Sequence, residues 1–181
     1  TDQDFLGITF KGVGPEYDFS FFKDNLVSGN IPTFSDTANK GQIFISAATA
    51  DKMQLKAGDK VFAYFISDNG VKVRKFTVSG IFQTNMSQFD NNLCFTDIYT
   101  TRKLNRWEDG LCTGAELMVS DFNEVNTVAG RIEQKVNRTS DRYGNIFTSQ
   151  TIYEAYPQLF SWLSLLDINV WIILALMMCV A

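Results

Sequence analysis

The sequence predicts an α+β domain that is followed by the start of a membrane-spanning helix. Over residues 1–155, short alternating segments typical of strands interleave with short segments of helical periodicity. The central strands are joined by a hairpin turn and not by a helical crossover, which is typical of an α+β fold and not of a doubly wound one. Residues 156–181 end in an apolar run. The length of 181 residues fits one compact domain with a short extension.

The elements of the first half are predicted from periodicity and from the turn and cap residues between them. They are, in order, a strand over residues 6–11, a turn over 12–15, a helix over 18–26, a strand over 42–45, a helix up to residue 54, a turn over 56–59 and a strand over 61–66. Asp18 and Ser46 precede the two helices and are predicted to cap them, because their side chains can accept hydrogen bonds from free backbone N–H groups.

The clearest local signal in the chain is Asp68-Asn69-Gly70 between two alternating segments, which predicts a tight β-hairpin. The elements predicted from this point on are a strand over residues 71–82, a strand over 93–95, a helix over 97–105 capped by Asp97, a strand over 115–119 and a helix opened by Asp121. Glu124 stands three residues after Asp121, a spacing that resembles a capping box.

Composition and motifs exclude several function classes. The chain has no histidine, which rules out Ser-His and Cys-His catalysis, histidine-ligated zinc and a histidine pH switch. Its 16 basic and 20 acidic residues give a formal charge of −4, which argues against a nucleic-acid binder. The sequence contains no P-loop, and no paired carboxylates for general acid–base work are visible. We therefore expect no catalytic residue, no cofactor and no metal site, in a protein that is not an enzyme.

The cysteines leave two alternatives open. Cys94 and Cys112 can form a disulfide in an oxidising compartment, or they can remain two unpaired thiols. Cys179 lies in the apolar run, where a thiol is expected to be inert.

The C-terminal region is long and apolar enough for a bilayer span. From residue 161 to residue 181, the side chains that are not apolar are Ser161, Ser164, Asp167 and Asn169. A helix packed on the domain is the alternative, but residues 171–181 are apolar all round. No Lys or Arg follows Arg142, and cytoplasmic flanks of membrane helices are rich in both, so we expect the domain on the outer side. We interpret the chain as a piece of a longer protein.

Five segments, taken in order, resemble one family. They are Lys11-Gly12-Val13 with Pro15, the ISAATA and LKAGDKV stretches at residues 45–50 and 55–61, FTVSGIF at 76–82, Met86 with Phe89-Asp90, and YPQLF at 156–160. Together they are similar to the extracytoplasmic domain of ABC-transporter permeases of the MacB/FtsX superfamily, and most of all to the lipoprotein-releasing permeases of the LolC/LolE type.

The resemblance implies a MacB-like periplasmic domain over residues 1–155, with a ferredoxin-like β/α subdomain and a smaller, mostly β subdomain. Residues 156–181 would be the juxtamembrane segment and the beginning of a second transmembrane helix. The implied protein lies in the bacterial inner membrane, with this domain in the periplasm. It would couple ATP hydrolysis by a separate ABC ATPase subunit to lipoprotein release. The other implied partners are a second permease subunit, lipoprotein cargo and a periplasmic carrier chaperone.

Two other functions stay open beside this one. One is a MacB- or FtsX-type permease that transmits mechanical work to efflux or to cell-wall hydrolases. The other is a membrane-anchored binding or enzyme domain outside the superfamily. The short turn at residues 68–70 departs from the long hairpin with which Lol permeases recruit the carrier chaperone. The resemblance is therefore also compatible with the partner-type permease, or with a homodimer that docks differently.

The candidate site lies where the chain is expected to meet the membrane. Its proposed lipid- or cargo-facing residues are Leu159, Phe160, Leu163 and Leu166. Packing of these side chains against a neighbouring span is the alternative. A second group of residues is expected to have structural roles in turns: Gly58, Asp59, Asn69, Gly70, Gly80 and Asp90.

Overall fold

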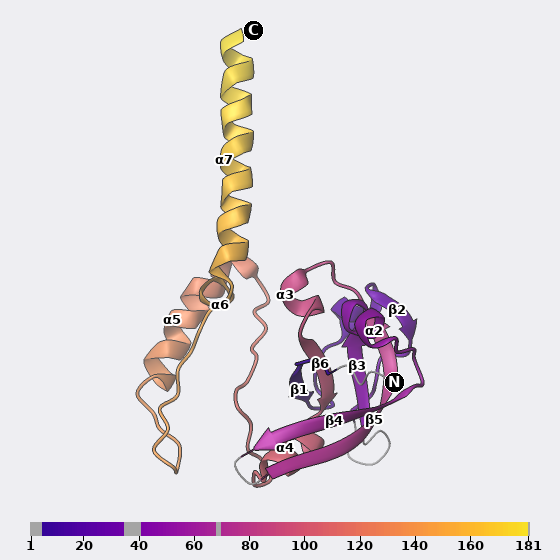
Figure 1. Cartoon of the computed structure of the whole chain (residues 1–181). Coiled ribbons are helices and arrows are strands. Elements are labelled where there is room, and N and C mark those ends of the chain that lie inside the picture. Colours follow the sequence, from indigo (N-terminus) through magenta and orange to yellow (C-terminus); the bar gives the residue numbers. More distant parts are fainter. Residues whose placement is uncertain (1–4, 35–40, 68–69, 181) are drawn as a thin grey trace. The chain divides into compact units, whose positions relative to one another are not determined.

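The computed structural model describes residues 5–34, 41–67 and 70–180, and Asp68 and Asn69 of the predicted hairpin lie outside the described residues (Figure 1). The chain divides into two compact units, Thr1–Gly114 and Ala115–Ala181. The fold combines helices with a mixed sheet and ends in an apolar helix, which agrees with the predicted α+β class. Each unit is described by itself below.

The first unit contains a mixed sheet. Its strands are β1 (Thr9–Val13), β2 (Leu26–Gly29), β3 (Gln42–Ser46), β4 (Lys60–Ser67), β5 (Gly70–Phe82) and β6 (Leu93–Asp97). The order along the sheet is β1-β6-β3-β5-β2, and β4 pairs with β5. β1 runs parallel to β6 and β3 parallel to β5, while the other pairs are antiparallel.

The β4–β5 hairpin agrees with the predicted one. Its register runs from Lys60 opposite Thr77 to Ser67 opposite Gly70. β5 is long enough to continue beyond this pairing, and its second half lies between β2 and β3. β5 therefore joins the hairpin to the central part of the sheet.

The helices of the first unit are short. They are α1 (Ser20–Lys23), α2 (Ala47–Met53), α3 (Ser87–Asp90) and α4 (Ile98–Asn105). Both predicted caps of the longer helices are present: the Ser46 side chain accepts a hydrogen bond from the N–H of Thr49, and Asp97 accepts one from the N–H of Thr100. These side chains satisfy backbone donors that the first turn of a helix leaves without intrahelical partners.

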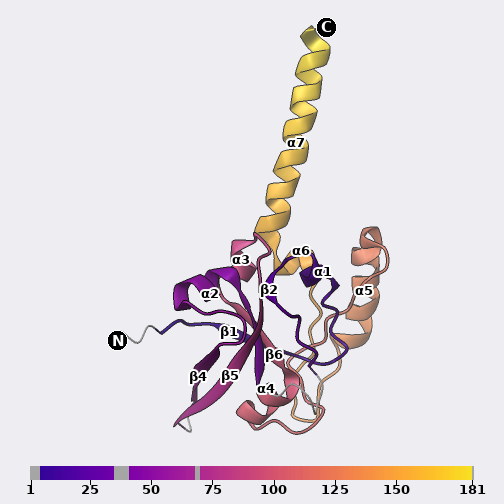
Figure 2. The same ribbon diagram turned by 90° about the vertical axis from the view of Figure 1, so that its right-hand side faces the viewer.

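Two apolar clusters form the core, and alternation along β3 assigns its side chains to both. Ile43 and Ile45 belong to the cluster that also contains Ala50 of α2. Phe44, which points to the other face, belongs to a cluster of phenylalanines that includes Phe22 of α1. Figure 2 shows α1 and α2 on opposite sides of the strands. The central strands of this sheet are thus covered on both faces.

The second unit is helical. Its elements are the 3-10 helix η1 (Phe122–Glu124), α5 (Val125–Val136), α6 (Ile152–Ala155) and α7 (Pro157–Val180). Asp121 accepts a hydrogen bond from the N–H of Asn123, so it caps η1. The apolar side of α5 is half-buried, and no residue of this helix is fully buried.

Three predicted elements differ from the structure. The helix predicted over residues 18–26 is confined to α1, because Leu26 pairs with Phe82 as the start of β2. The predicted turn over residues 12–15 begins later, since Gly12 and Val13 continue β1 beside β6. The predicted strand over residues 115–119 is absent, because that segment has no strand partner among the described residues.

Candidate functional site

The apolar helix α7 is the feature from which a candidate site can be built. It has 24 residues and therefore a length of about 36 Å at 1.5 Å per residue. Residues Pro157–Cys179 have a mean hydropathy of 2.0 in their most apolar window, and none of that window is buried inside the protein. By length and composition, it is the one helix in the described part of the chain that can cross a membrane.

The start of α7 is fixed by local sequence. Thr151 and Glu154 form a capping box that begins α6: the N–H of Glu154 donates to the Thr151 hydroxyl, and the N–H of Thr151 donates to the Glu154 carboxylate. Tyr156 then leaves the helical conformation, with φ −130° and ψ 57°. Pro157 opens α7, where a missing N–H costs no intrahelical bond. Past this point α7 is continuous.

Three aromatic rings pack together at the foot of α7. The rings of Tyr153 and Phe160 have centroids 4.4 Å apart. Phe122, from η1, lies 5.6 Å from Tyr153 and 6.5 Å from Phe160. We call these residues the ring cluster. It joins η1, α6 and α7 inside the second unit, and each such ring pair contributes about 0.5–1.5 kcal/mol beyond area burial.

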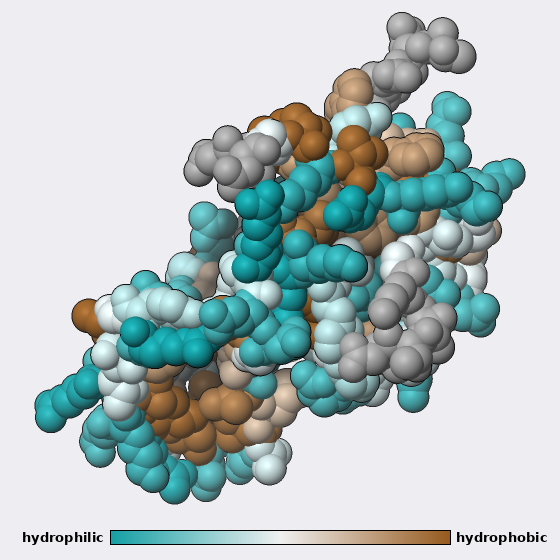
Figure 3. All heavy atoms as spheres, turned by 90° about the horizontal axis from the view of Figure 1, so that it is seen from below, coloured by the Kyte–Doolittle hydropathy of each residue, from teal (hydrophilic) through white to brown (hydrophobic). Residues whose placement is uncertain are grey.

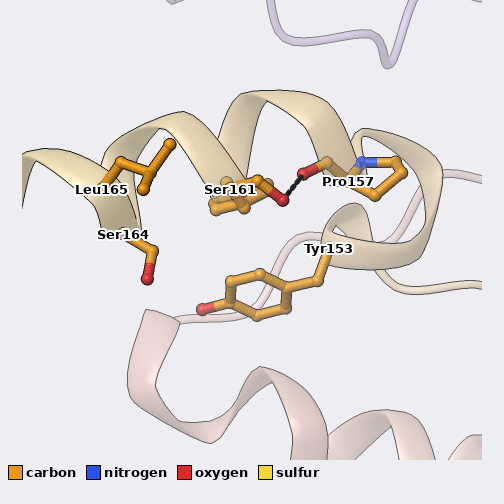
Figure 4. Close-up of a pocket in the computed structure, with 6 residues that line it drawn as sticks. Tyr153, Pro157, Ser161, Ser164 and Leu165 are labelled. Carbon is orange, nitrogen blue, oxygen red and sulfur yellow. Dashed lines mark hydrogen bonds between the residues drawn. The ribbon is translucent and has the colours of Figure 1, made fainter.

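An open, shallow pocket of about 570 Å³ lies beside the ring cluster (Figure 4). Its lining residues are Tyr153, Pro157, Phe160, Ser161, Ser164 and Leu165. The Ser161 hydroxyl donates to the carbonyl of Pro157 at 2.8 Å, which is the hydrogen bond drawn in the figure. The lining combines apolar surface with hydroxyls and contains no charged side chain, so it suits an apolar group better than an ion.

The four candidate residues do not share one side of α7. Leu159, Leu163 and Leu166 follow at steps of four and three, which places them on one face of a helix. Phe160 is turned away from that face by about 100° and lines the pocket instead. Leu163 and Leu166 are half-exposed, at 50% and 52%. The structure therefore separates a leucine face, made of Leu159, Leu163 and Leu166, from the pocket.

The residues expected in turns lie as follows. Gly58 has φ +94°, and the Asp59 carboxylate accepts a hydrogen bond from the N–H of Lys56 at 2.8 Å. Gly70 starts β5 with φ +105°. The Asp90 carboxylate is buried and accepts hydrogen bonds from the N–H and the hydroxyl of Thr84, at 3.0 and 2.8 Å. Asn69 is outside the described residues.

Gly80 lies in β5 where the strand meets the segment at residues 28–30. A Cβ at this position would come within 2.6 Å of the Asn30 carbonyl oxygen. The backbone of β5 and the neighbouring segment therefore approach closely here.

The cysteines are free thiols. Cys94 is buried in the core of the first unit, and Cys112 is exposed. Burial raises the pKa of the Cys94 thiol well above its usual range, because the thiolate would lose its hydration. Cys94 and Cys112 are not bridged in this structure.

The described residues contain no group of three or more acidic or cysteine side chains that could hold a metal ion. Neither a protein-family model nor a curated protein matches the chain. Of the residues that line the pocket, the sequence prediction included Phe160 and missed Tyr153, Pro157, Ser161, Ser164 and Leu165. The Thr151–Glu154 capping box was a readable signal for the short helix that presents Tyr153.

Proposed function

We propose that the chain is the periplasmic part of an ABC-transporter permease of the MacB/FtsX type, and that it couples ATP hydrolysis by a separate subunit to the release of lipoproteins from the inner membrane. The sequence segments that resemble this superfamily support the proposal. The observation that carries it is the continuity of α7, which leaves the ring cluster as one helix long and apolar enough to enter a bilayer.

The mechanism follows from this continuity. A helix without a glycine or proline after Pro157 transmits a displacement along its axis instead of absorbing it at a kink. The ring cluster fastens the foot of α7 to η1 and α6. A movement of α7 that starts at the ATPase would therefore reach α6 and η1. Such coupling needs only different contacts in two conformations and no catalytic residue.

The cargo would meet α7 on its leucine face. Leu159, Leu163 and Leu166 present aliphatic side chains, which suit the acyl chains of a lipoprotein, and Asp167, four residues after Leu163, is the acidic side chain beside them. Burial of acyl chains contributes about 0.8 kcal/mol per methylene group. In the alternative, the same face packs against a neighbouring span.

A proline substitution tests the lever role of α7. In the full-length permease with its ATPase, Leu163→Pro is expected to abolish lipoprotein release, because proline removes a helical hydrogen bond and kinks the helix. Leu163→Ala is the matched control, since it shortens the same side chain and keeps the helix. Release is measured as the transfer of a labelled lipoprotein from proteoliposomes on addition of ATP. Unchanged release by the proline variant would refute the lever.

The side of the membrane and the partners belong to the same proposal. The absence of basic residues after Arg142 favours a periplasmic position for the domain. A permease of this type works as a homodimer or heterodimer with an ABC ATPase subunit.

The short β4–β5 connection argues against direct recruitment of a carrier chaperone. Only two residues separate Ser67 from Gly70, so the hairpin has no long extension for a carrier chaperone. This favours the partner-type permease, or a relative that transmits mechanical work to efflux or to cell-wall hydrolases. Purified carrier chaperone tests this preference: its binding to the full-length protein would argue for direct chaperone recruitment and against both variants.

A further inference from the structure

The β4–β5 hairpin exposes an apolar face. Side chains alternate along a strand, so Phe62, Tyr64 and Ile66 point to one side of β4. The register places Lys75, Val73 and Val71 opposite them on β5. Lys60, opposite Thr77, completes this side of the hairpin. The opposite side, with Val61, Ala63 and Phe65, packs against the core of the first unit.

The apolar residues of this face are open to solvent. Ile66 is 84% exposed, and Phe62, Tyr64, Val71 and Val73 are between 42% and 60% exposed. Phe5, itself 74% exposed, adds its ring 5.7 Å from that of Tyr64. In Figure 1 the hairpin lies at the lower side of the first unit, and Figure 3, which is seen from below, shows hydrophobic atoms exposed at the surface. A contiguous apolar patch of this kind marks an interaction site.

The charged side chains within the paired strands of the hairpin have one sign. The described residues of β4 and of the paired part of β5 contain four basic side chains and no acidic one, although the whole chain has a net charge of −4. Lys75 is the cross-strand neighbour of Phe62, and Lys60 lies at the same end of the face. The other two, Lys72 and Arg74, alternate to the opposite side. A partner that matches this face is therefore apolar in its centre and acidic at one end.

The strand edge adds a second constraint. Among the described strands, β4 pairs with β5 alone. The outer edge of β4 thus offers backbone N–H and C=O groups to another chain. Lipid tails cannot satisfy such groups, whereas an extended peptide can do so by adding a strand. A second copy that faced this one would bring its Lys60 and Lys75 against the same two basic residues. The occupant that fits best is an acidic extended segment of a different protein.

We propose that the β4 edge and the exposed face of the hairpin bind, as an added strand, an extended peptide segment whose side chains on that face are apolar in the centre and acidic at one end. The segment would place its apolar side chains against Tyr64, Ile66 and Val73. Its carboxylates would lie near Lys60 and Lys75. This site is built from residues of the first unit and does not depend on the transport function proposed above.

The test uses the whole chain in lipid nanodiscs and two labelled nine-residue peptides, Val-Ser-Val-Ser-Val-Ser-Glu-Ser-Glu and the same peptide with Lys in place of Glu, so that the apolar and the charged side chains lie on one face of the strand. Fluorescence anisotropy is expected to show saturable binding of the Glu peptide and at least tenfold weaker binding of the Lys peptide. Hydrogen exchange of the β4 amides is expected to slow when the Glu peptide binds. Equal binding of both peptides, or no change in β4 exchange, would overturn the proposal.

Surface variants assign the binding to this face. Ile66→Thr keeps a β-branched side chain on an exposed position and is expected to weaken binding of the Glu peptide about tenfold; Lys75→Gln is expected to weaken it several-fold. Val27→Thr on exposed β2 and Lys52→Gln on α2 are the matched controls and should leave it unchanged. Two other results would overturn the acidic-segment proposal if the chain binds no peptide. One is self-association of the chain that is lost in Ile66→Thr, and the other is attachment to nanodiscs of anionic lipid that is lost in the same variant.

Discussion

Gly80 lies at a close backbone approach in the described sheet, and Gly80→Ala tests whether that approach is required. A Cβ at this position would lie 2.6 Å from the carbonyl oxygen of Asn30 and 3.1 Å from both the nitrogen of Asn30 and the carbonyl oxygen of Ser28. All three atoms belong to the backbone. The segment is also held to β5 by the N–H of Asn30, which donates to the carbonyl of Ser79 at 2.8 Å.

The cost of this methyl group follows from what must move. Real Cβ atoms do not approach backbone oxygen within 2.6 Å, so β2 has to shift away from β5 and weaken its pairing with Gly80 and Phe82. Overpacking of this kind costs about 1–3 kcal/mol. For a unit of this size the loss corresponds to a fall in the melting temperature of roughly 4–12 °C.

Thermal unfolding in detergent micelles, followed by circular dichroism, measures this fall. Gly7→Ala is the matched control, since a Cβ at Gly7 meets nothing within 4 Å. The control is expected to melt within about 2 °C of the wild type, as surface substitutions change stability by less than about 0.5 kcal/mol. A Gly80→Ala variant that melts with the control would show that β2 is not packed on β5 as described.

Three further predictions concern the core, the thiols and one surface carboxylate. Phe44→Ala is expected to lower the free energy of unfolding of the first unit by about 3–5 kcal/mol in urea unfolding, because Phe44 is fully buried. Phe62→Ala, at an exposed position, should lower it far less. Equal losses would contradict the assigned core. In the native protein a maleimide should label Cys112 and spare Cys94, as read by mass spectrometry, since Cys94 is buried and its pKa is raised; rapid labelling of both would contradict this. Hydrogen bonds from Asn145 hold the pKa of Asp141 below its usual value of 3.8. The ionised carboxylate therefore stabilises the fold above pH 3.8, and this stabilisation is lost as the pH falls through the lower pKa of the folded state. Urea midpoints between pH 5 and pH 2 should therefore fall less in Asp141→Asn than in the wild type, and identical slopes would refute the assignment.

The parts of the fold that sequence could predict are those with local causes. Ser46 and Asp97 cap their helices as predicted, because a cap needs only a short polar side chain within three residues of the N–H that it accepts. The hairpin between β4 and β5 is local for the same reason. These elements form from neighbours in the chain and are readable from it.

The elements that were predicted wrongly depend on pairing partners that are distant in the sequence. Leu26 fits the helical periodicity of residues 18–26, but its pairing with Phe82 draws it into a strand. Leu117 and Met118 stand in an alternating segment, yet they are 66% and 89% exposed and no described strand pairs with them. A single sequence predicts the local preference of such segments, but it does not show which strand they pair with in the folded protein.

The candidate site was predictable in position and not in detail. The apolar composition of residues 161–181 located α7, and helical steps of three and four placed Leu159, Leu163 and Leu166 together. The pocket beside Phe160 was not predicted, because it depends on the break at Tyr156 and on the ring of Tyr153 folding back towards α7. The break is local, since Tyr156 precedes Pro157, but the ring contact joins two helices and cannot be predicted from periodicity.

Co-purification of the full-length protein from bacterial inner membranes tests the proposed function most directly. The protein is extracted in mild detergent, and its companions are identified by mass spectrometry, with Leu163→Pro prepared in parallel to separate assembly from release. The account predicts that an ABC ATPase subunit and acylated lipoproteins accompany the wild type. Recovery of the protein without an ATPase subunit, in a preparation where known transporter complexes stay intact, would contradict it.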